Sequence, residues 1–90
     1  MTQEEVVTRL KTLLSERVRV APERAQALAA DAPLLKDGLG LDSLDCVELT
    51  LGMEEAFGLV FDESEQDWMQ HFASLASLAQ LVLVAKGELT

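Results

Sequence analysis

The sequence predicts an all-α protein, specifically a small four-helix bundle with a short third helix and a long first loop. Three segments repeat apolar residues at helical spacing, and each is preceded by a residue that can cap a helix. The chain has 90 residues, a length at which one small hydrophobic core is the rule. We therefore expect residues 1–90 to form one domain in which the helices bury their apolar stripes against each other.

The first helix is predicted from Glu4 to about Val18. Thr2 can accept a hydrogen bond at its N-terminus, and Glu5, three residues later, completes a capping box. The core-facing positions recur every three or four residues, at Val6, Val7, Leu10, Leu13, Leu14 and Val18.

A long connection follows from Arg19 to Asp42, interrupted by prolines and glycines. Pro22 can open a short helical turn before Asp31, because proline suits the first position of a helix. Four leucines are expected to hold the rest of the connection against the bundle, namely Leu34, Leu35, Leu39 and Leu41.

The second helix, from Leu44 to Phe57, carries two apolar stripes where a surface helix needs only one. At 100° per residue the wider stripe, predicted to face the core, contains Cys46, Leu49, Thr50, Met53, Ala56 and Phe57. The opposite stripe contains Leu44, Val47 and Leu51, with acidic residues around it at Asp45, Glu48, Glu54 and Glu55. We interpret this second stripe as a surface for a partner protein. Gly52 weakens the helix by about 1 kcal/mol relative to alanine, and the pattern offers no reason for it.

After Gly58 the chain turns, and the acidic residues 62–65 suit the start of a short third helix that reaches about His71. Its apolar contribution comes from Trp68, Met69 and Phe72. Ser74 or Ser77 can cap the last helix, which ends at Lys86 before Gly87. Its inward stripe is predicted to contain Leu75, Leu78, Leu81, Val82 and Ala85.

The formal charge of −9 is unevenly distributed along the chain. Ten aspartates or glutamates, and no lysine or arginine, lie between Asp37 and Ala85. Such a segment repels nucleic acid, which excludes it as a partner. The same field attracts basic protein surfaces and speeds their encounter with this chain.

Cys46 is the only cysteine, so an internal disulfide is excluded, and no cluster of zinc ligands is recognisable. The acidic N-terminus does not resemble a secretory signal. The longest apolar stretch, Leu78 to Ala85, is too short to span a bilayer. We expect a cytoplasmic monomer that does not insert into membranes.

The segment from Gly38 to Asp45 places one serine, Ser43, where a glycine-rich loop enters the second helix. No base lies near Ser43 in the sequence, so the pattern favours an attachment point over a catalytic nucleophile. The run Asp42-Ser43-Leu44-Asp45, followed by Val47-Glu48-Leu49, resembles the signature of acyl carrier proteins, and the likeness extends over about Leu34 to Phe61.

The resemblance implies that a phosphopantetheinyl transferase joins 4′-phosphopantetheine from coenzyme A to the hydroxyl of Ser43. The thiol of this arm would hold acyl groups as thioesters, so the protein would be a carrier and not an enzyme. Its partners would be a ketosynthase, an acyltransferase and other acyl-processing enzymes with basic docking surfaces. The partner face would comprise Asp42, Leu44, Asp45, Val47, Glu48, Leu51, Glu54 and Glu55. An acyl pocket between the helices would be lined by Leu49, Met53, Phe57, Phe61, Trp68, Leu75 and Leu78.

Several positions depart from a housekeeping fatty-acid carrier. The run from Gly38 to Leu41 is one residue longer than usual before the serine, Asp62 stands where proline is common, and Ser64 to Phe72 is extended by about two residues. These departures favour a specialised fatty-acid or polyketide pathway. An aminoacyl or peptidyl carrier and an unmodified acidic helical adaptor remain alternatives.

Other functions fit the sequence less well. A Ser-His-Asp hydrolase built on Ser43 and His71 lacks the G-x-S-x-G turn. The twelve residues from Asp37 to Glu48 begin and end like a calcium-binding loop, but leucines stand at two ligand positions and Asp42 replaces the central glycine. Cys46 falls on the core face, where a cysteine acts as a small apolar residue.

Overall fold

The fold is all-α, as the sequence predicts. A computed structural model describes residues 1–35, 38–61 and 68–87. Over these residues the elements are α1 (Gln3–Arg17), α2 (Pro22–Ala27), α3 (Ser43–Phe57), the 3₁₀ helix η1 (Trp68–Ala73) and α4 (Leu75–Ala85). The short α2 lies inside the long first connection, and η1 stands where the short third helix is predicted.

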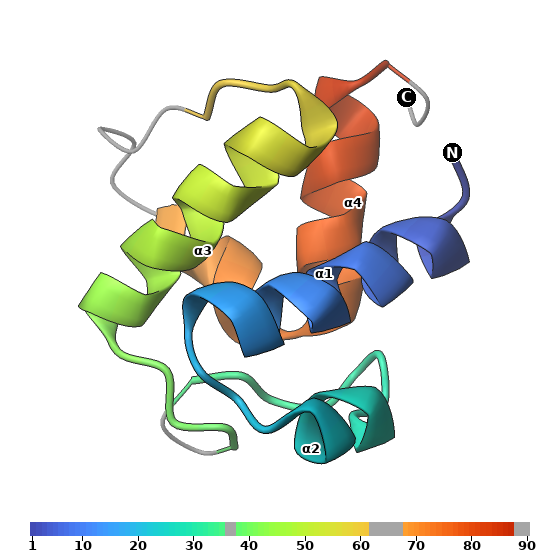
Figure 1. The fold of residues 1–90 in the computed structure, drawn as a ribbon. Helices are drawn as coiled ribbons and strands as arrows, with labels where there is room; N and C mark the ends of the chain where they lie inside the picture. The colour runs from blue at the N-terminus through green and yellow to red at the C-terminus, as the bar shows by residue number, and fades with distance from the viewer. Residues whose placement is uncertain (36–37, 62–67, 88–90) are drawn as a thin grey trace.

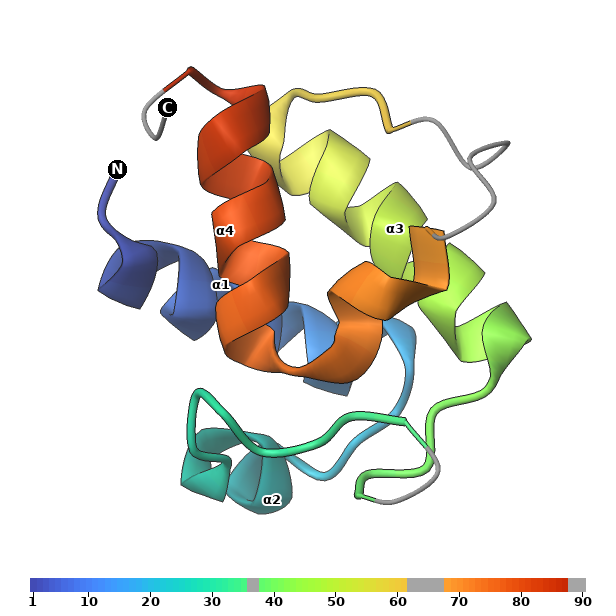
Figure 2. The same cartoon turned by 180° about the vertical axis from the view of Figure 1, so that it is seen from behind.

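Helix α1 is the centre of the arrangement, because it packs against α2, α3 and α4. In Figure 1 it crosses in front of α4, with α3 to one side and α2 beneath. The opposite view in Figure 2 shows η1 between α3 and α4, with which it is in contact. The core therefore lies between α1 on one side and α3, η1 and α4 on the other.

Three of the helices begin with a capping box, in which two residues exchange side-chain to backbone hydrogen bonds. Thr2 and Glu5 form the box of α1, as predicted. Asp42 and Asp45 form the box of α3. Ser74 and Ser77 form the box of α4, so both serines offered as caps take part in one motif.

The buried stripe of α4 differs from the prediction at two positions. Leu75, Leu78 and Val82 are buried as predicted, whereas Ala85 is exposed and Leu81 is only half-buried. The remaining buried positions are Ala79 and Leu83. Because α4 packs against both α1 and η1, its buried stripe is wider than predicted, and it ends at Leu83.

The contact between α1 and α3 explains Gly52. This residue is buried, and a Cβ atom on it would lie 3.0 Å from Arg17 Cγ and 3.2 Å from Leu13 Cδ2. Glycine therefore lets the two helices approach closely. The cost to helix propensity is offset by this packing.

The long connection is fixed to the bundle at several points. Lys11 Nζ donates to the carbonyl of Gln26 at 3.1 Å and so ties the end of α2 to α1. Leu34 and Leu41 are buried, while Leu35 and Leu39 pack against the core, which confirms the role predicted for these leucines. The backbone N–H of Leu34 donates to the carbonyl of Ala73 at 3.1 Å, which places the connection beside η1.

The structure describes α3 with the chain after it to Phe61, and then η1 from Trp68. Helix α3 ends at Phe57, and its C-cap residue Gly58 has a φ of 66°. Lys86 Nζ donates to the carbonyl of Phe57 at 3.3 Å. The predicted acidic start of the third helix, residues 62–65, lies outside the described residues. In η1, Phe72 is buried and meets the ring of Trp68 edge to face, with centroids 5.5 Å apart.

Candidate functional site

Ser43 is the first residue of α3 and directly follows the extended N-cap residue Asp42. Its side chain is exposed. Within the described residues, no hydrogen-bond partner is found for its hydroxyl. The oxygen is therefore accessible at the N-terminus of a 15-residue helix, where free backbone N–H groups favour a bound phosphate.

The two carboxylates beside Ser43 hold the helix terminus together. Asp42 Oδ1 accepts from the backbone N–H of Asp45 at 2.9 Å, and Asp45 Oδ2 accepts from that of Asp42 at 3.2 Å. These bonds fix the backbone on both sides of Ser43. Ser43 is thus held in a defined backbone conformation at the start of α3.

Cys46 lies one turn further along and faces the core, as predicted. Burial raises the pKa of its thiol to about 11, and the negative charges of Asp45 and then Asp42 act in the same direction. The thiol is therefore protonated at neutral pH and unreactive, which agrees with a structural role.

The buried face of α3 contains Cys46, Leu49, Thr50, Met53 and Phe57, as predicted, together with Gly52. Ala56 was assigned to this face, and that assignment is wrong because its side chain is exposed. It lines a hollow of about 210 Å³ between α1 and α3, beside Thr12 and Leu13. A single methyl group is too short to fill this space.

The outer face of α3 carries the second apolar stripe. Leu44 is 75% exposed and Leu51 is 44% exposed, while Val47 is half-buried. Glu48 lies between them, is exposed, and has no hydrogen-bond or ion-pair partner among residues 1–35, 38–61 and 68–87. Leu44, Glu48 and Leu51 are spaced four and three residues apart, so they share one face of the helix.

The two glutamates near the end of α3 make contacts within the protein. Glu54 Oε2 accepts from the backbone N–H of Phe61 at 2.8 Å, and Glu55 pairs with Arg17 of α1. Both glutamates belong to the predicted partner face, and the sequence carries no sign of these contacts. No periodic signal links Glu55 to a residue 38 positions earlier in the chain.

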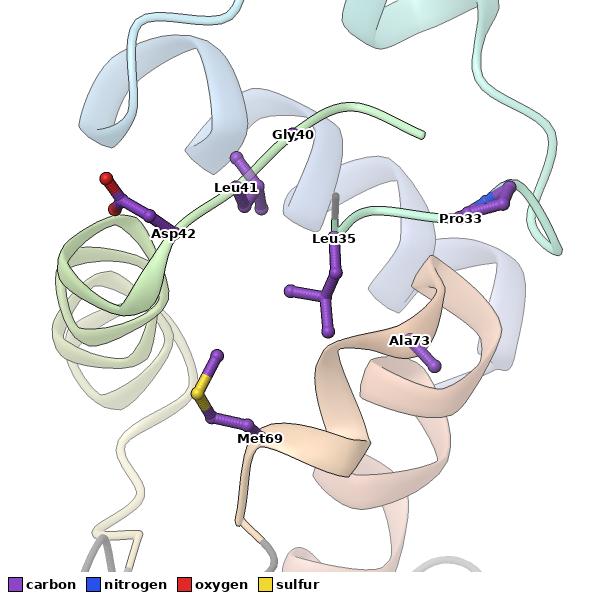
Figure 3. Close-up of a pocket in the computed structure, with 7 residues that line it drawn as sticks. All are labelled: Pro33, Leu35, Gly40, Leu41, Asp42, Met69 and Ala73. Carbon is purple, nitrogen blue, oxygen red and sulfur yellow. The ribbon is translucent and has the colours of Figure 1, made fainter. Parts of the chain in front are cut away.

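A cavity of about 610 Å³ opens beside the start of α3, between the end of the long connection and η1 (Figure 3). Its described lining consists of Pro33, Leu35, Gly40, Leu41, Asp42, Met69 and Ala73. None of the seven residues predicted to line an acyl pocket is among them. Leu49, Met53, Phe57, Leu75 and Leu78 are buried in the core, and Phe61 and Trp68 pack against it. Their contact with an acyl chain stays a prediction.

The sequence also raised calcium binding and a hydrolase that uses His71. In the described part of the chain, no three His, Cys, Asp or Glu side chains gather where they could hold a metal ion. His71 is half-buried in η1, next to the buried Phe72. None of the helices described has the length and hydropathy needed to cross a bilayer.

An exposed serine at the first position of a helix is compatible with an attachment site on a carrier protein. The sequence matches the family described as phosphopantetheine attachment site over residues 8–82. It is 38% identical over 63 residues to an acyl carrier protein of Campylobacter hominis, covering 70% of this chain and 75% of the relative. An acyl carrier protein of Coprothermobacter proteolyticus is 29% identical over 86 residues, which are 96% of this chain and the whole of the relative.

A third relative, an acyl carrier protein of Thermosynechococcus vestitus, is 33% identical over 67 residues, covering 74% of this chain and 78% of the relative. The chain therefore belongs to the acyl carrier protein family. Its cofactor is the phosphopantetheine that this family attaches, and its role is to carry acyl groups for acyl-processing enzymes, not to catalyse a reaction.

Proposed function

We propose that Ser43 carries the 4′-phosphopantetheine arm and that residues 1–90 form one carrier domain. The single observation that supports Ser43 most directly is the exposure of its side chain at the first position of α3. Its hydroxyl makes no hydrogen bond within the described part of the chain, so modification breaks no contact there.

The attachment transfers the 4′-phosphopantetheinyl group of coenzyme A. The Ser43 oxygen forms a bond to phosphorus, the pyrophosphate bond of coenzyme A breaks, adenosine 3′,5′-bisphosphate leaves, and the hydroxyl proton passes to a base of the transferase. This chain needs to supply only the positioned hydroxyl. When bound, the arm supplies the thiol that holds an acyl group as a thioester.

We propose further that the outer face of α3 presents the arm to partner enzymes with basic docking surfaces, including the transferase, a ketosynthase and an acyltransferase. Leu44 and Leu51 supply apolar contact area, and Glu48 supplies charge. The negative field of residues 37–85 increases the rate of encounter with basic surfaces. The departures at Gly38–Leu41 and Asp62 support a specialised fatty-acid or polyketide pathway.

One experiment tests the attachment residue. The protein is incubated with coenzyme A, Mg²⁺ and a promiscuous phosphopantetheinyl transferase, and its intact mass is recorded. The wild type and the control Ser15→Ala, which removes a hydroxyl from α1, should each gain one phosphopantetheine. Ser43→Ala should gain nothing. A gain in Ser43→Ala would place the arm elsewhere, and no gain in the wild type would favour the unmodified adaptor.

A further inference from the structure

Arg17, in the last turn of α1, pairs with Glu55 on the outer face of α3. Its side chain passes Gly52, where a Cβ atom would lie 3.0 Å from Arg17 Cγ and 3.4 Å from Arg17 Nε. The Arg17 side chain is 35% exposed, whereas that of Glu55 is 67% exposed. Because the stem of Arg17 is packed against α3, its guanidinium is held near Glu55 at a small cost in side-chain entropy.

This pairing divides the carboxylates of α3 into two groups. Glu48 and Glu55 are seven residues apart, so they share the outer face of the helix, separated by two turns. Glu48 has no partner in the part of the chain that the structure describes. Glu55 is paired, and the neighbouring Glu54 accepts from the backbone N–H of Phe61. A basic partner therefore meets an unpaired carboxylate at Glu48 and carboxylates already in use at the far end of α3.

The far end of α3 offers an apolar groove in place of an unpaired charge. This groove, which we call the Val60 groove, has a volume of about 380 Å³ and is lined by Arg17, Leu51, Glu54, Glu55, Leu59 and Val60. Val60 is 91% exposed and Leu51 is 44% exposed, so both present apolar surface to a partner. Because Leu51 also belongs to the docking surface proposed on α3, the groove is continuous with that surface.

One protein interface is large enough to cover both ends of α3. Glu55 lies twelve residues after Ser43, which is roughly 18 Å along the helix. A typical interface covers about 800 Å² on each partner, and such an area spans this distance. An enzyme that acts at Ser43 can therefore also contact the Val60 groove.

We propose that Arg17 and the Val60 groove together select the partners of this carrier. The inference rests on the attachment proposed at Ser43. The partner that fits is an enzyme with basic side chains against the Glu48 end of α3 and an apolar side chain in the Val60 groove. An enzyme that places a lysine or arginine at the far end meets the guanidinium of Arg17, which repels this cation and already holds Glu55.

Titration with a short lysine peptide tests whether Arg17 keeps cations from the far end of α3. Protein labelled with ¹³C at the glutamate side-chain carboxyl groups is prepared as the wild type, Arg17→Gln and Arg24→Gln. Pentalysine is added at low ionic strength, where surface charges are weakly screened. Arg24 is exposed on α2, so Arg24→Gln removes the same charge from another helix without releasing Glu55. The carboxyl signals of Glu48 and Glu55 are followed by NMR.

We expect pentalysine to shift the Glu48 signal in all three proteins and to shift the Glu55 signal strongly only in Arg17→Gln, because only this variant leaves Glu55 without its cation. A Glu55 shift equal to that of Glu48 in the wild type would overturn the role of Arg17. So would an unmoved Glu55 signal in Arg17→Gln. A strong Glu55 shift in both arginine variants would assign the effect to net charge, and the specific pairing would be overturned.

The Val60 groove is tested by steady-state kinetics with the promiscuous phosphopantetheinyl transferase, coenzyme A and Mg²⁺. Val60→Gln should raise the KM for the carrier by about threefold or more, because an apolar contact is lost. The kcat should not change, since the groove is far from Ser43. Val84→Gln makes the same substitution on α4, where Val84 is 52% exposed, and should keep both constants close to those of the wild type.

Equal KM values for the wild type and both valine variants would overturn the groove as a contact point. A lower mass of Val60→Gln in sedimentation, with an unchanged KM, would identify a second copy of the chain as the occupant and would also overturn it.

The mass measurement at Ser43 separates this proposal from the one on which it rests. If the wild type gains no phosphopantetheine, both are overturned. A normal gain together with an unchanged KM in Val60→Gln, or with equal shifts of Glu48 and Glu55 in the wild type, overturns only the selection of partners.

Discussion

The two faces of α3 are both rich in apolar residues, yet the fold uses them differently. On the inner face, Cys46 and Leu49 are fully buried and Met53 is 1% exposed. On the outer face, Leu44 is 75% exposed and Leu51 is 44% exposed. The inner residues pack α3 against the rest of the fold, whereas the exposed outer residues are those proposed to be recognised by other proteins.

The carboxylates of the same helix show a second contrast. Asp42 and Asp45 cap its start, Glu54 binds the backbone of Phe61, and Glu55 pairs with Arg17. Glu48 makes no such contact in the part of the chain that the structure describes. A count of acidic residues therefore overstates how much charge the helix offers to a partner, and the proposed docking surface narrows to Leu44, Glu48 and Leu51.

The largest expected effect comes from truncating one leucine on each face. Leu49→Ala should lower the free energy of unfolding by about 2–5 kcal/mol, because it leaves a cavity in the core. Leu44→Ala, the same chemical change on the outer face, should alter it by less than about 0.5 kcal/mol. Urea unfolding followed by circular dichroism measures both. Equal losses would contradict the assignment of the two faces.

The next largest loss of stability is expected from a substitution at the contact between α1 and α3. Gly52→Leu should destabilise the protein by about 1–3 kcal/mol, because its side chain would meet Leu13 and Arg17. This loss is expected although leucine favours helices by about 1 kcal/mol over glycine. Gly52→Ala is the informative control, since the small methyl group sets a close contact against a better helix propensity. A more stable Gly52→Leu protein would show that the helices do not approach closely there.

A smaller effect is expected at the start of α3. Asp42→Ala should lower the free energy of unfolding by about 0.5–2 kcal/mol, because the first turn loses a hydrogen bond to the backbone of Asp45. Ser74→Ala removes the equivalent bond of α4 and should cost a similar amount. Thermal unfolding of the two variants compares their losses of stability. If Asp42→Ala had no effect while Ser74→Ala was destabilising, the capping box at Ser43 would not contribute to the fold.

The smallest effect on stability is expected for Glu48→Lys, within about 0.5 kcal/mol of the wild type, because the side chain is exposed. Acyl transfer by a partner with a basic docking surface should nevertheless slow, and the difference should shrink as salt is added. Glu23→Lys makes the same change of charge on the exposed surface of α2 and should leave transfer close to that of the wild type. Equal rates in both variants would remove Glu48 from the docking surface. Asp45 is unsuitable for this test, because reversing its charge also breaks the capping box.

Much of the fold follows from the sequence because its signals are local. The residues that form a helical pattern and those that cap it lie within a few positions of each other in the sequence. The bounds of α1, α3 and α4 were therefore predicted to within one or two residues. The motif at Ser43 depends on neighbours in the chain for the same reason. The family match covers residues 8–82, which include this motif.

What only the tertiary structure decided depends on residues far apart in the chain. The contact between Glu55 and Arg17, the close approach at Gly52 and the exposure of Ala56 arise where α1 crosses α3. The cavity at Leu35 and Met69 forms because the long connection is held beside η1 by hydrogen bonding between Leu34 and Ala73. Local patterns determine which helices form and which residue is proposed for attachment, whereas the crossing of those helices determines which side chains are buried and which stay exposed.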